Sequence, residues 1–418
     1  MEDIGKDQGG PPRDSAELWQ PGTRALTLGL LLTVLFTAFE ALAVATVLPR
    51  IVEDIGGLSL YGWAFSAFML ANLVGIVAAG RLGESRPPVL VFGLGTLVFA
   101  AGLGGAGLAP TMSWVVAARV LQGLGAGAIS TVSYLAVGRG YSAAARPAMI
   151  AALSSAWVIP GLVGPALAGW IADTIGWRWV FHLLAPAALA GAALAMPGLQ
   201  RITVPPAEPS ASADTIPQGL PGLWASLFSL LLIGFVFFGA EAFIPLALID
   251  IRGLGAAQAG LPLTIGSVLW TAGAWVQARE APRRRLDNLV ALGVLLIVLG
   301  VGASSVVLDT SWPAWSVGPG WAIASLGMGI AYSTAALAVL ECIPPGREAS
   351  HSSWLSLSMN LGIAIGTAVA GSIVAAGNAR GTELTTSLAS VNILMVLVGL
   401  AALLATRWMP ARPGTTNS

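Results

Sequence analysis

Charged residues are scarce in this 418-residue chain: they make up 10% of it, whereas an ordinary soluble domain has about 25%. Hydrophobic residues make up 56%, and the mean hydropathy is +0.81. These values exclude a soluble α/β domain and indicate an all-α membrane protein that crosses the bilayer many times. The lipid bilayer is therefore the first partner that the sequence predicts.

Cysteine and histidine are almost absent too. The single cysteine, Cys342, excludes an intramolecular disulfide and a cysteine metal cluster. The 2 histidines lie far apart in the sequence, and neither has another metal-binding residue as a partner. No Gly-x-x-x-x-Gly-Lys-Ser/Thr motif occurs, so we expect no nucleotide-binding loop and no use of ATP. The net charge of zero gives no reason to expect nucleic acid. No metal or organic cofactor is expected either.

Long apolar runs dominate the chain instead. A transmembrane helix needs about 20 mostly apolar residues. Twelve runs qualify: 26–49, 60–80, 89–109, 113–137, 148–172, 177–198, 222–247, 257–278, 288–308, 314–340, 350–376 and 386–408. The first run is too long for a signal-peptide core, so we expect it to be a retained helix.

A Pro- and Ser-rich segment separates the first six runs from the last six, and it is typical of a surface linker. The sequence therefore predicts twelve transmembrane helices in two pseudo-symmetric six-helix bundles. The expected parts are a disordered cytoplasmic tail (1–24), a first bundle (25–198), a cytoplasmic linker (199–221), a second bundle (222–408) and a cytoplasmic tail (409–418).

Positive charges are distributed unevenly between the two ends of the spans. With the N-terminus on the cytoplasmic side, fifteen of the 20 lysines and arginines lie on that side. Four lie on the other side, namely Arg50, Arg178, Arg252 and Arg380, and only Arg119 lies within a span. Positively charged loops favour the cytoplasm, so both termini are expected there. High glycine and alanine with few lysines suggest a GC-rich bacterium, so we expect the inner membrane.

The two halves of the chain are weak repeats. At an offset of 202, residues 124–127 (Leu-Gly-Ala-Gly) match residues 326–329 (Leu-Gly-Met-Gly), and Gly164 matches Gly366. Glu40 matches Glu241 at an offset of 201. Two six-helix halves related by an axis along the membrane normal are typical of transporters that bind their substrate between the halves.

Three charged residues lie well inside the predicted spans: Glu40, Arg119 and Glu241. The helical rise places them about 13, 9 and 9 Å from the non-cytoplasmic ends of their spans, which is a similar depth. A charge within a membrane costs a few kcal/mol and needs a partner, so we expect Glu40 to pair with Arg119.

A proton site is one interpretation of this pair. A low dielectric favours the neutral carboxyl group and a nearby arginine favours the ionised one, so moving Arg119 relative to Glu40 would switch proton affinity. The alternative is a static ion pair that fixes helix packing. Glu241 is a second acid, for a substrate charge or a second proton, or with a structural role near the membrane face.

Polar and aromatic residues inside the spans are candidates for substrate binding, because an aromatic wall suits a hydrophobic or cationic ligand. Plain packing is the alternative for each of them. The candidates are Met69, Asn72, Gln122, Trp157, Trp270, Tyr332 and Asn360.

Three local motifs are more specific. Residues 119–127 read Arg-x-x-Gln-Gly-x-Gly-x-Gly, and residues 161–169 read Gly-x-x-Gly-Pro-x-x-Ala-Gly. A loop carries Gly80, Glu84 and Arg86, followed by two prolines. Over about 26–408 the chain resembles the major facilitator superfamily, most closely its twelve-helix drug:proton antiporters. The first motif is similar to the family's fourth-helix arginine motif and the second to its fifth-helix antiporter motif, with Ala168 replacing a glycine.

The resemblance implies roles for these motifs. Gly161, Gly164, Pro165 and Gly169 would pack tightly to seal the outer face while the cavity opens inward. The loop of Gly80, Glu84 and Arg86 would lock one conformation, although it lacks the basic pair that the family usually has there. Protons would be the coupling ion.

Together these features predict a proton-coupled secondary transporter that exports lipophilic or cationic small molecules by alternating access, as in multidrug efflux and drug resistance. We expect a monomer. Export of an endogenous lipid or secondary metabolite, or proton-coupled uptake, stays open. A membrane receptor or an integral-membrane enzyme is a distant alternative, because the sequence predicts neither a sizeable soluble domain nor a polar catalytic set at one interface.

Overall fold

The computed structural model describes residues 16–142, 145–202, 221–281, 283–341 and 348–409. Within these ranges every regular element is helical, and eleven helices are long and apolar enough to cross a membrane. Most of the predicted linker (199–221) and of the predicted tails (1–24 and 409–418) lies outside the described residues. The all-helical membrane fold expected from the sequence is confirmed.

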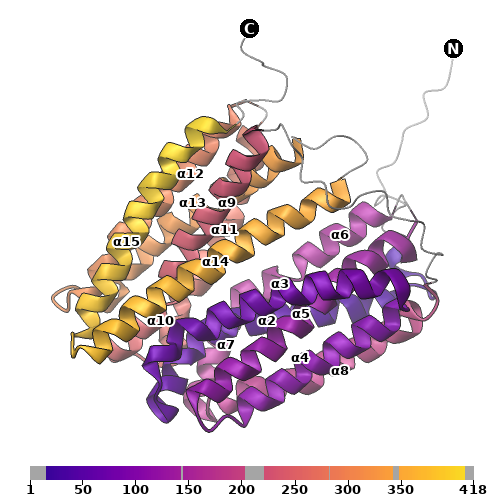
Figure 1. Ribbon diagram of the computed structural model, residues 1–418, viewed down its shortest axis with the longest axis horizontal. Coiled ribbons are helices and arrows are strands. Elements are labelled where there is room, and N and C mark those ends of the chain that lie inside the picture. The colour runs from indigo at the N-terminus through magenta and orange to yellow at the C-terminus, as the bar shows by residue number, and fades with distance from the viewer. Residues whose placement is uncertain (1–15, 143–144, 203–220, 282, 342–347, 410–418) are drawn as a thin grey trace, which may run out of the picture.

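Two helical bundles make up the molecule (Figure 1). The first contains α2 (Arg24–Ile55), α3 (Tyr61–Ser85), α4 (Pro88–Gly107), α5 (Met112–Gly140), α6 (Arg146–Ser155), α7 (Val158–Thr174) and α8 (Arg178–Leu199). The second contains α9 (Pro221–Glu241), α10 (Ile244–Leu246), α11 (Ala256–Glu280), α12 (Leu286–Ser304), α13 (Val317–Glu341), α14 (Glu348–Ala379) and α15 (Leu384–Ala405). We call the end where α2 begins and α15 ends the termini end, and the opposite one the far end.

The helices contact one another mostly within a bundle, and two seams join the bundles. In one seam α3 packs along α14, and in the other α7 packs along α11. The central helix α2 also contacts α11.

Prolines break two of the predicted spans. The fifth run (148–172) is divided into α6 and α7 at Ala156 and Trp157, and the seventh (222–247) stops at Glu241 before α10 and a π-helical turn at Ala247–Ile251. Proline has no N–H, so Pro160 and Pro245 each leave the carbonyl four residues earlier without its helical hydrogen bond. Those carbonyls belong to Ala156 and Glu241, where the breaks occur.

Glycine contacts show that the two bundles repeat the same packing. A Cβ at Gly125 would lie 2.5 Å from the amide nitrogen of Phe99, and one at Gly327 would lie 2.8 Å from that of Ile297. The close contact of Gly102 with Gln122 in the first bundle is repeated by the contact of Gly300 with Ala324 in the second. Equivalent residues are therefore 198 positions apart in α4 and α12, and 202 positions apart in α5 and α13. The extra four residues lie in the connection between α12 and α13.

The described part of the predicted disordered tail, residues 16–24, is more ordered than predicted. Glu17–Trp19 form a 3-10 helix inside the expected disordered tail. Leu18 is buried, and the Glu17 carboxylate accepts hydrogen bonds from the backbone N–H (3.0 Å) and the hydroxyl (2.5 Å) of Ser142. Burial of one leucine and two hydrogen bonds therefore fix this segment to the residues that follow α5.

Candidate functional site

A buried ion pair lies between α2 and α5. Arg119 Nη1 donates a hydrogen bond to Glu40 Oε1, and both side chains are almost completely buried. The pairing expected from their similar depth is therefore observed. A charge inside a membrane protein is tolerated when it is paired and hydrogen-bonded, and this pair meets both conditions.

Three further groups surround the guanidinium of Arg119. Its Nε donates to the carbonyl of Ala64 on α3 at 2.9 Å, and its Nη1 also donates to Gln122 Oε1 at 2.6 Å. The ring of Phe68 lies 4.1 Å from the guanidinium carbon, a cation–π contact. The arginine is thus bonded to α2, α3 and its own helix at once, and Gln122 belongs to this network rather than to a substrate surface.

Gln122 is itself fixed on its second side, because its amide nitrogen donates to the carbonyl of Gly102 on α4 at 3.1 Å. Gly102 allows this approach: a Cβ there would lie 2.7 Å from the backbone nitrogen of Gln122. The network therefore ties four helices of the first bundle together.

One atom of the network has no partner. Glu40 Oε2 is buried and has no hydrogen bond within the described residues. An unpaired oxygen in a dry interior is costly for a carboxylate and less so for a protonated carboxyl group.

The second bundle has an aromatic pair where the first has its ion pair. Trp321 corresponds to Arg119 by the offset of 202, and its ring lies 4.7 Å from that of Phe237 on α9. Phe237 thus makes the contact that Glu40 makes in the first bundle. The predicted match of Glu40 with Glu241, at an offset of 201, is therefore wrong. By its packing Phe237 is the equivalent of Glu40, and Glu241 lies one turn beyond Phe237.

Glu241 lies apart from the Arg119 network. It is half-buried at the end of α9, and no hydrogen bond or ion pair to its side chain is found among the described residues. It shares a helix face with Phe238, whose ring lies 6.1 Å from that of Trp270. Glu241 therefore stands beside an aromatic cluster without a counter-ion.

That cluster contains two of the predicted substrate residues. The rings of Trp270 and Tyr332 are 5.9 Å apart, and Trp270 also lies 5.6 Å from Phe237. Both Trp270 and Tyr332 are half-buried, so part of each ring stays accessible. An aromatic surface with a carboxylate nearby suits an apolar or cationic ligand.

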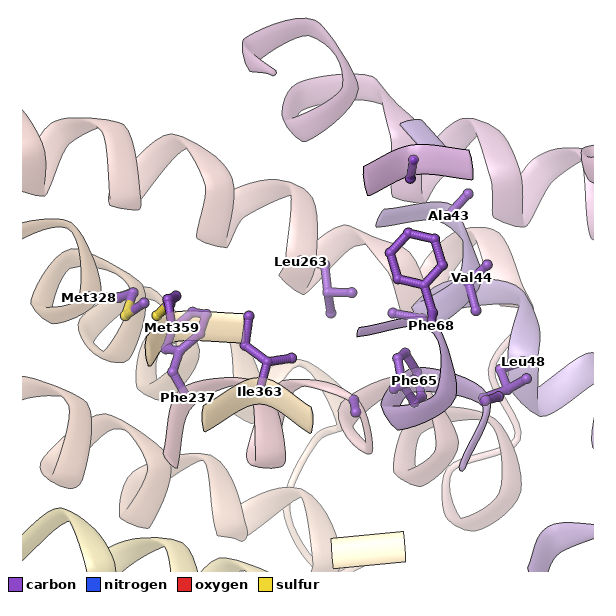
Figure 2. Close-up of a cluster of buried hydrophobic side chains, with 14 of the residues drawn as sticks. Ala43, Val44, Leu48, Phe65, Phe68, Phe237, Leu263, Met328, Met359 and Ile363 are labelled. Atoms are coloured by element: carbon purple, nitrogen blue, oxygen red, sulfur yellow. The ribbon is translucent and has the colours of Figure 1, made fainter. Parts of the chain in front are cut away.

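Three other candidates lie in or beside the α3–α14 seam. Asn360 donates to Asn72 across the seam at 3.4 Å, and both are half-buried, as is Met69. Nearby, buried apolar side chains of the two bundles meet: Figure 2 shows Leu263 of α11 between Phe68 on one side and Phe237 on the other. Trp157 lies at the α6–α7 break, is 48% exposed and makes no ring contact with the described residues.

The predicted glycine motif lies on α7, largely along the α7–α11 seam. A Cβ at Gly169 would come within 2.5 Å of the carbonyl carbon of Ala256, and one at Gly161 within 3.1 Å of Ser267. The carbonyl of Pro165 faces Gly260 in the same seam. Gly164 differs, because it faces Phe39 of its own bundle at an ordinary 3.7 Å.

The prediction that Gly80 and Glu84 lie in a loop is wrong, because α3 continues to Ser85. Few contacts are observed at these positions. Gly80 is exposed, with no atom within 4 Å of an added Cβ, and Arg86 is exposed without an ion pair to any described residue. The side chain of Glu84 lies outside the described part of the chain. Among the described residues, no group of three or more histidine, cysteine or acidic side chains could hold a metal ion.

Comparisons with known proteins agree with this architecture. A family model described as Major Facilitator Superfamily matches residues 30–367. The multidrug transporter protein MdtP of Bacillus subtilis (strain 168) is 29% identical over 175 residues, or 42% of this chain and 32% of that protein. The Acurin A biosynthesis cluster MFS-type transporter of Aspergillus aculeatus is 28% identical over 191 residues, or 46% of this chain and 33% of that protein. The matched stretches span about a third of each relative.

A solved structure is similar over nearly the whole chain. A bacterial homologue of the human lysosomal transporter Spinster, in an inward-facing and unoccupied conformation, superposes with a TM-score of 0.76 at 15% identity. The superposition covers 96% of this chain and 98% of that one. At this identity the likeness establishes the fold alone.

Proposed function

Because the chain belongs to the Major Facilitator Superfamily, whose members are secondary transporters and not enzymes, we propose that it exports lipophilic or cationic small molecules in exchange for protons. The observation that carries the proposal is the buried network of Glu40, Arg119 and Gln122. It combines a titratable carboxyl group, a counter-ion held by several hydrogen bonds and one unpaired buried oxygen.

The network is mechanically connected to the seam between the bundles. Arg119 holds the carbonyl of Ala64, and two residues further along α3 the hydroxyl of Ser66 donates to Ala364 on α14 at 2.9 Å. Protonation of Glu40 removes the charge that Arg119 neutralises, and this weakens the attraction between α2 and α5. A change in the position of Arg119 would reach the α3–α14 seam through α3.

The half-buried aromatic cluster is the proposed substrate surface. Trp270, Tyr332 and Phe238 offer apolar and π faces, and Glu241 places a carboxyl group one turn from Phe238. A cation would satisfy Glu241, and a neutral lipophilic compound would use the rings alone. The multidrug role stated in the name of the Bacillus relative supports this substrate class.

The direction of transport rests on charge and on contacts. We infer that the termini end faces the cytoplasm of a bacterium, because positive residues are in excess there and the positive-inside rule favours that orientation. Contacts between the bundles are dense at the far end, where Tyr61 donates to the carbonyl of Ala242 at 2.9 Å and Gly169 packs on Ala256. With that orientation, these contacts support a state closed to the outside, in which a cytoplasmic substrate would be loaded.

Export of a secondary metabolite is the second candidate. It is favoured by the relative from the Acurin A biosynthesis cluster, whose similarity to this chain is comparable in length and identity to that of MdtP. The same aromatic surface would serve it, so the two candidates differ in substrate rather than in mechanism.

The test is transport into proteoliposomes under an imposed pH gradient, with a panel of lipophilic cations and neutral drugs. Glu40→Gln should abolish gradient-driven accumulation yet keep substrate counterflow without a gradient, because binding and alternation remain. Glu280→Gln is the matched control and should behave as the parent, because Glu280 is half-buried at the end of α11 and pairs with Arg284, outside the Arg119 network. Full gradient-driven transport in Glu40→Gln would disprove the proton assignment, and loss in Glu241→Gln instead would move it to the second acid.

A further inference from the structure

The two seams that close the far end are built alike. A Cβ at Gly62 of α3 would clash with the carbonyl of Thr367 on α14, and one at Gly260 of α11 would lie 2.7 Å from the carbonyl of Pro165 on α7. The offsets are 198 and 202, the same as within the bundles. Each seam therefore places a glycine of one bundle against a backbone carbonyl of the other.

The polar contacts of the two seams are different. In the α3–α14 seam the hydroxyl of Ser66 bonds to the hydroxyl of Thr367 at 2.9 Å and to the carbonyl of Ala364. The equivalent of Ser66 on α11 is Thr264, whose hydroxyl is buried and has no partner among the described residues. The equivalent of Thr367 on α7 is Pro165, which has no hydroxyl to offer. The α7–α11 seam thus lacks the hydrogen bonds that hold its counterpart.

A single carboxylate replaces them at the far end of the seam. Asp173, in the last turn of α7, accepts hydrogen bonds from the backbone N–H groups of Ala256 (3.0 Å) and Ala257 (2.9 Å). These are the first residues of α11, whose own N-cap residue, Gly255, has no side chain to cap them. An anion at a helix N-terminus satisfies free N–H groups and the helix dipole together. Here the cap comes from the other bundle.

Arg50 completes the arrangement. Its Nη2 lies 3.2 Å from Asp173 Oδ1, and its Nη1 lies 2.6 Å from Glu53. Arg50 and Glu53 also line a polar pocket between the end of α2 and Asp250 of the second bundle. About a quarter of the Asp173 side chain is exposed (25%), so water can replace its bonds when the helices separate.

We propose that Asp173 is the gating residue of the far end: its carboxylate fastens the first bundle to the first turn of α11, and outward opening requires its release. A cap within one bundle would persist through a transport cycle, whereas this cap is lost whenever α7 leaves α11. The proposal rests on the alternating access of the proposed function, but on neither its direction nor its coupling to protons.

The experiment measures distances across the far end by double electron–electron resonance. In a Cys342→Ser background, spin labels are attached at Ile175→Cys and Trp312→Cys, which are 54% and 55% exposed on opposite bundles. Asp173→Asn should raise the ratio of open to closed populations about tenfold, because a charged cap and an ion pair are lost together. The matched control is Asp54→Asn, since Asp54 binds Arg178 and Trp177 within the first bundle only.

A second variant approaches the contact from α11. Ala256→Pro removes one N–H donor at a first-turn position that tolerates proline, after a residue that is already extended. It should shift the populations in the same direction as Asp173→Asn. The proposal is overturned if neither variant shifts them, or if Asp54→Asn shifts them equally. A shift in Asp173→Asn alone would assign the contact to Arg50 and overturn the capping of α11. No substrate or proton gradient is used, so failure of the export proposal would leave this result unaffected.

Discussion

Gly169 and Gly164 belong to the same motif on α7, yet an added methyl group should affect them very differently. A Cβ at Gly169 would lie 2.5 Å from the carbonyl carbon of Ala256, and ordinary contact begins at 3.4 Å, so α7 and α11 would have to separate by about 0.9 Å. The atoms in the way are backbone and cannot rotate aside. At Gly164 the nearest atom is a ring carbon of Phe39 at 3.7 Å, which needs no movement.

The cost of this overlap can be converted into a population. Overpacking of this kind costs about 1–3 kcal/mol. The cost applies only while α7 and α11 are in contact, so Gly169→Ala should raise the open-to-closed ratio of the far end by about 5- to 150-fold. Gly164→Ala should leave that ratio within about twofold, since a new methyl group at ordinary contact costs little.

The assay is alkylation of a cysteine placed inside the seam. Thr264→Cys, in the Cys342→Ser background, puts a thiol at the position on α11 equivalent to Ser66, where the threonine hydroxyl is buried. A membrane-impermeant maleimide added from the far side should modify it in proportion to the open population. Equal rates in Gly169→Ala and Gly164→Ala would refute the steric reasoning, as would a slower rate in Gly169→Ala.

Two further predictions concern charge. Arg119→Ala leaves Glu40 buried without a counter-ion, so stability should fall by about 3–5 kcal/mol and the pH dependence of substrate binding should shift. If titration of binding against pH gives the parent curve, Arg119 has only a structural role. Hydrogen bonds from the Ser142 hydroxyl and backbone N–H lower the pKa of Glu17. The contact between Glu17 and Ser142 is therefore fully formed at neutral pH. It weakens as the pH falls from about 4.3, the ordinary pKa of glutamate, through the lowered pKa. Glu17→Gln should accordingly speed hydrogen exchange of the Ser142 N–H at neutral pH, and an unchanged exchange rate would show that the contact contributes nothing.

Much of the fold follows from the sequence because the bilayer requires it. Runs of about 20 apolar residues can satisfy their backbone only as helices, so each predicted span overlaps an observed helix or pair of helices. The breaks at Ala156 and Glu241 were missed although Pro160 and Pro245 are visible, because a proline inside a membrane helix is compatible with either a kink or a break. The order of Glu17–Trp19 depends on Ser142, which is distant in sequence and so leaves no local pattern.

The site was predicted in part. Depth alone pairs Glu40 with Arg119, since two opposite charges at one level of a membrane have few alternatives. The contacts from Arg119 to Ala64 and Phe68 could not be predicted, because a carbonyl and a phenyl ring acquire a role only through the rotation of α3 against α5. The match of Glu40 with Glu241 failed because it used the offset of the segments that follow the four added residues before α13. Identities between glycine-rich segments do not show where those residues are added.

The aromatic pair of the second bundle has an electrical consequence. In the proposed mechanism the pair of Glu40 and Arg119 changes its charge, whereas Phe237 and Trp321 at the equivalent position have no titratable group. A cycle in which Glu40 alone exchanges one proton for a monovalent cation moves no net charge across the membrane. The same cycle with a neutral compound moves one charge, and the membrane potential then contributes about 2.3 kcal/mol per 100 mV. The voltage dependence of transport would therefore show how many acidic residues carry protons in each cycle. Glu241 would add a second charge only if it, too, carries a proton.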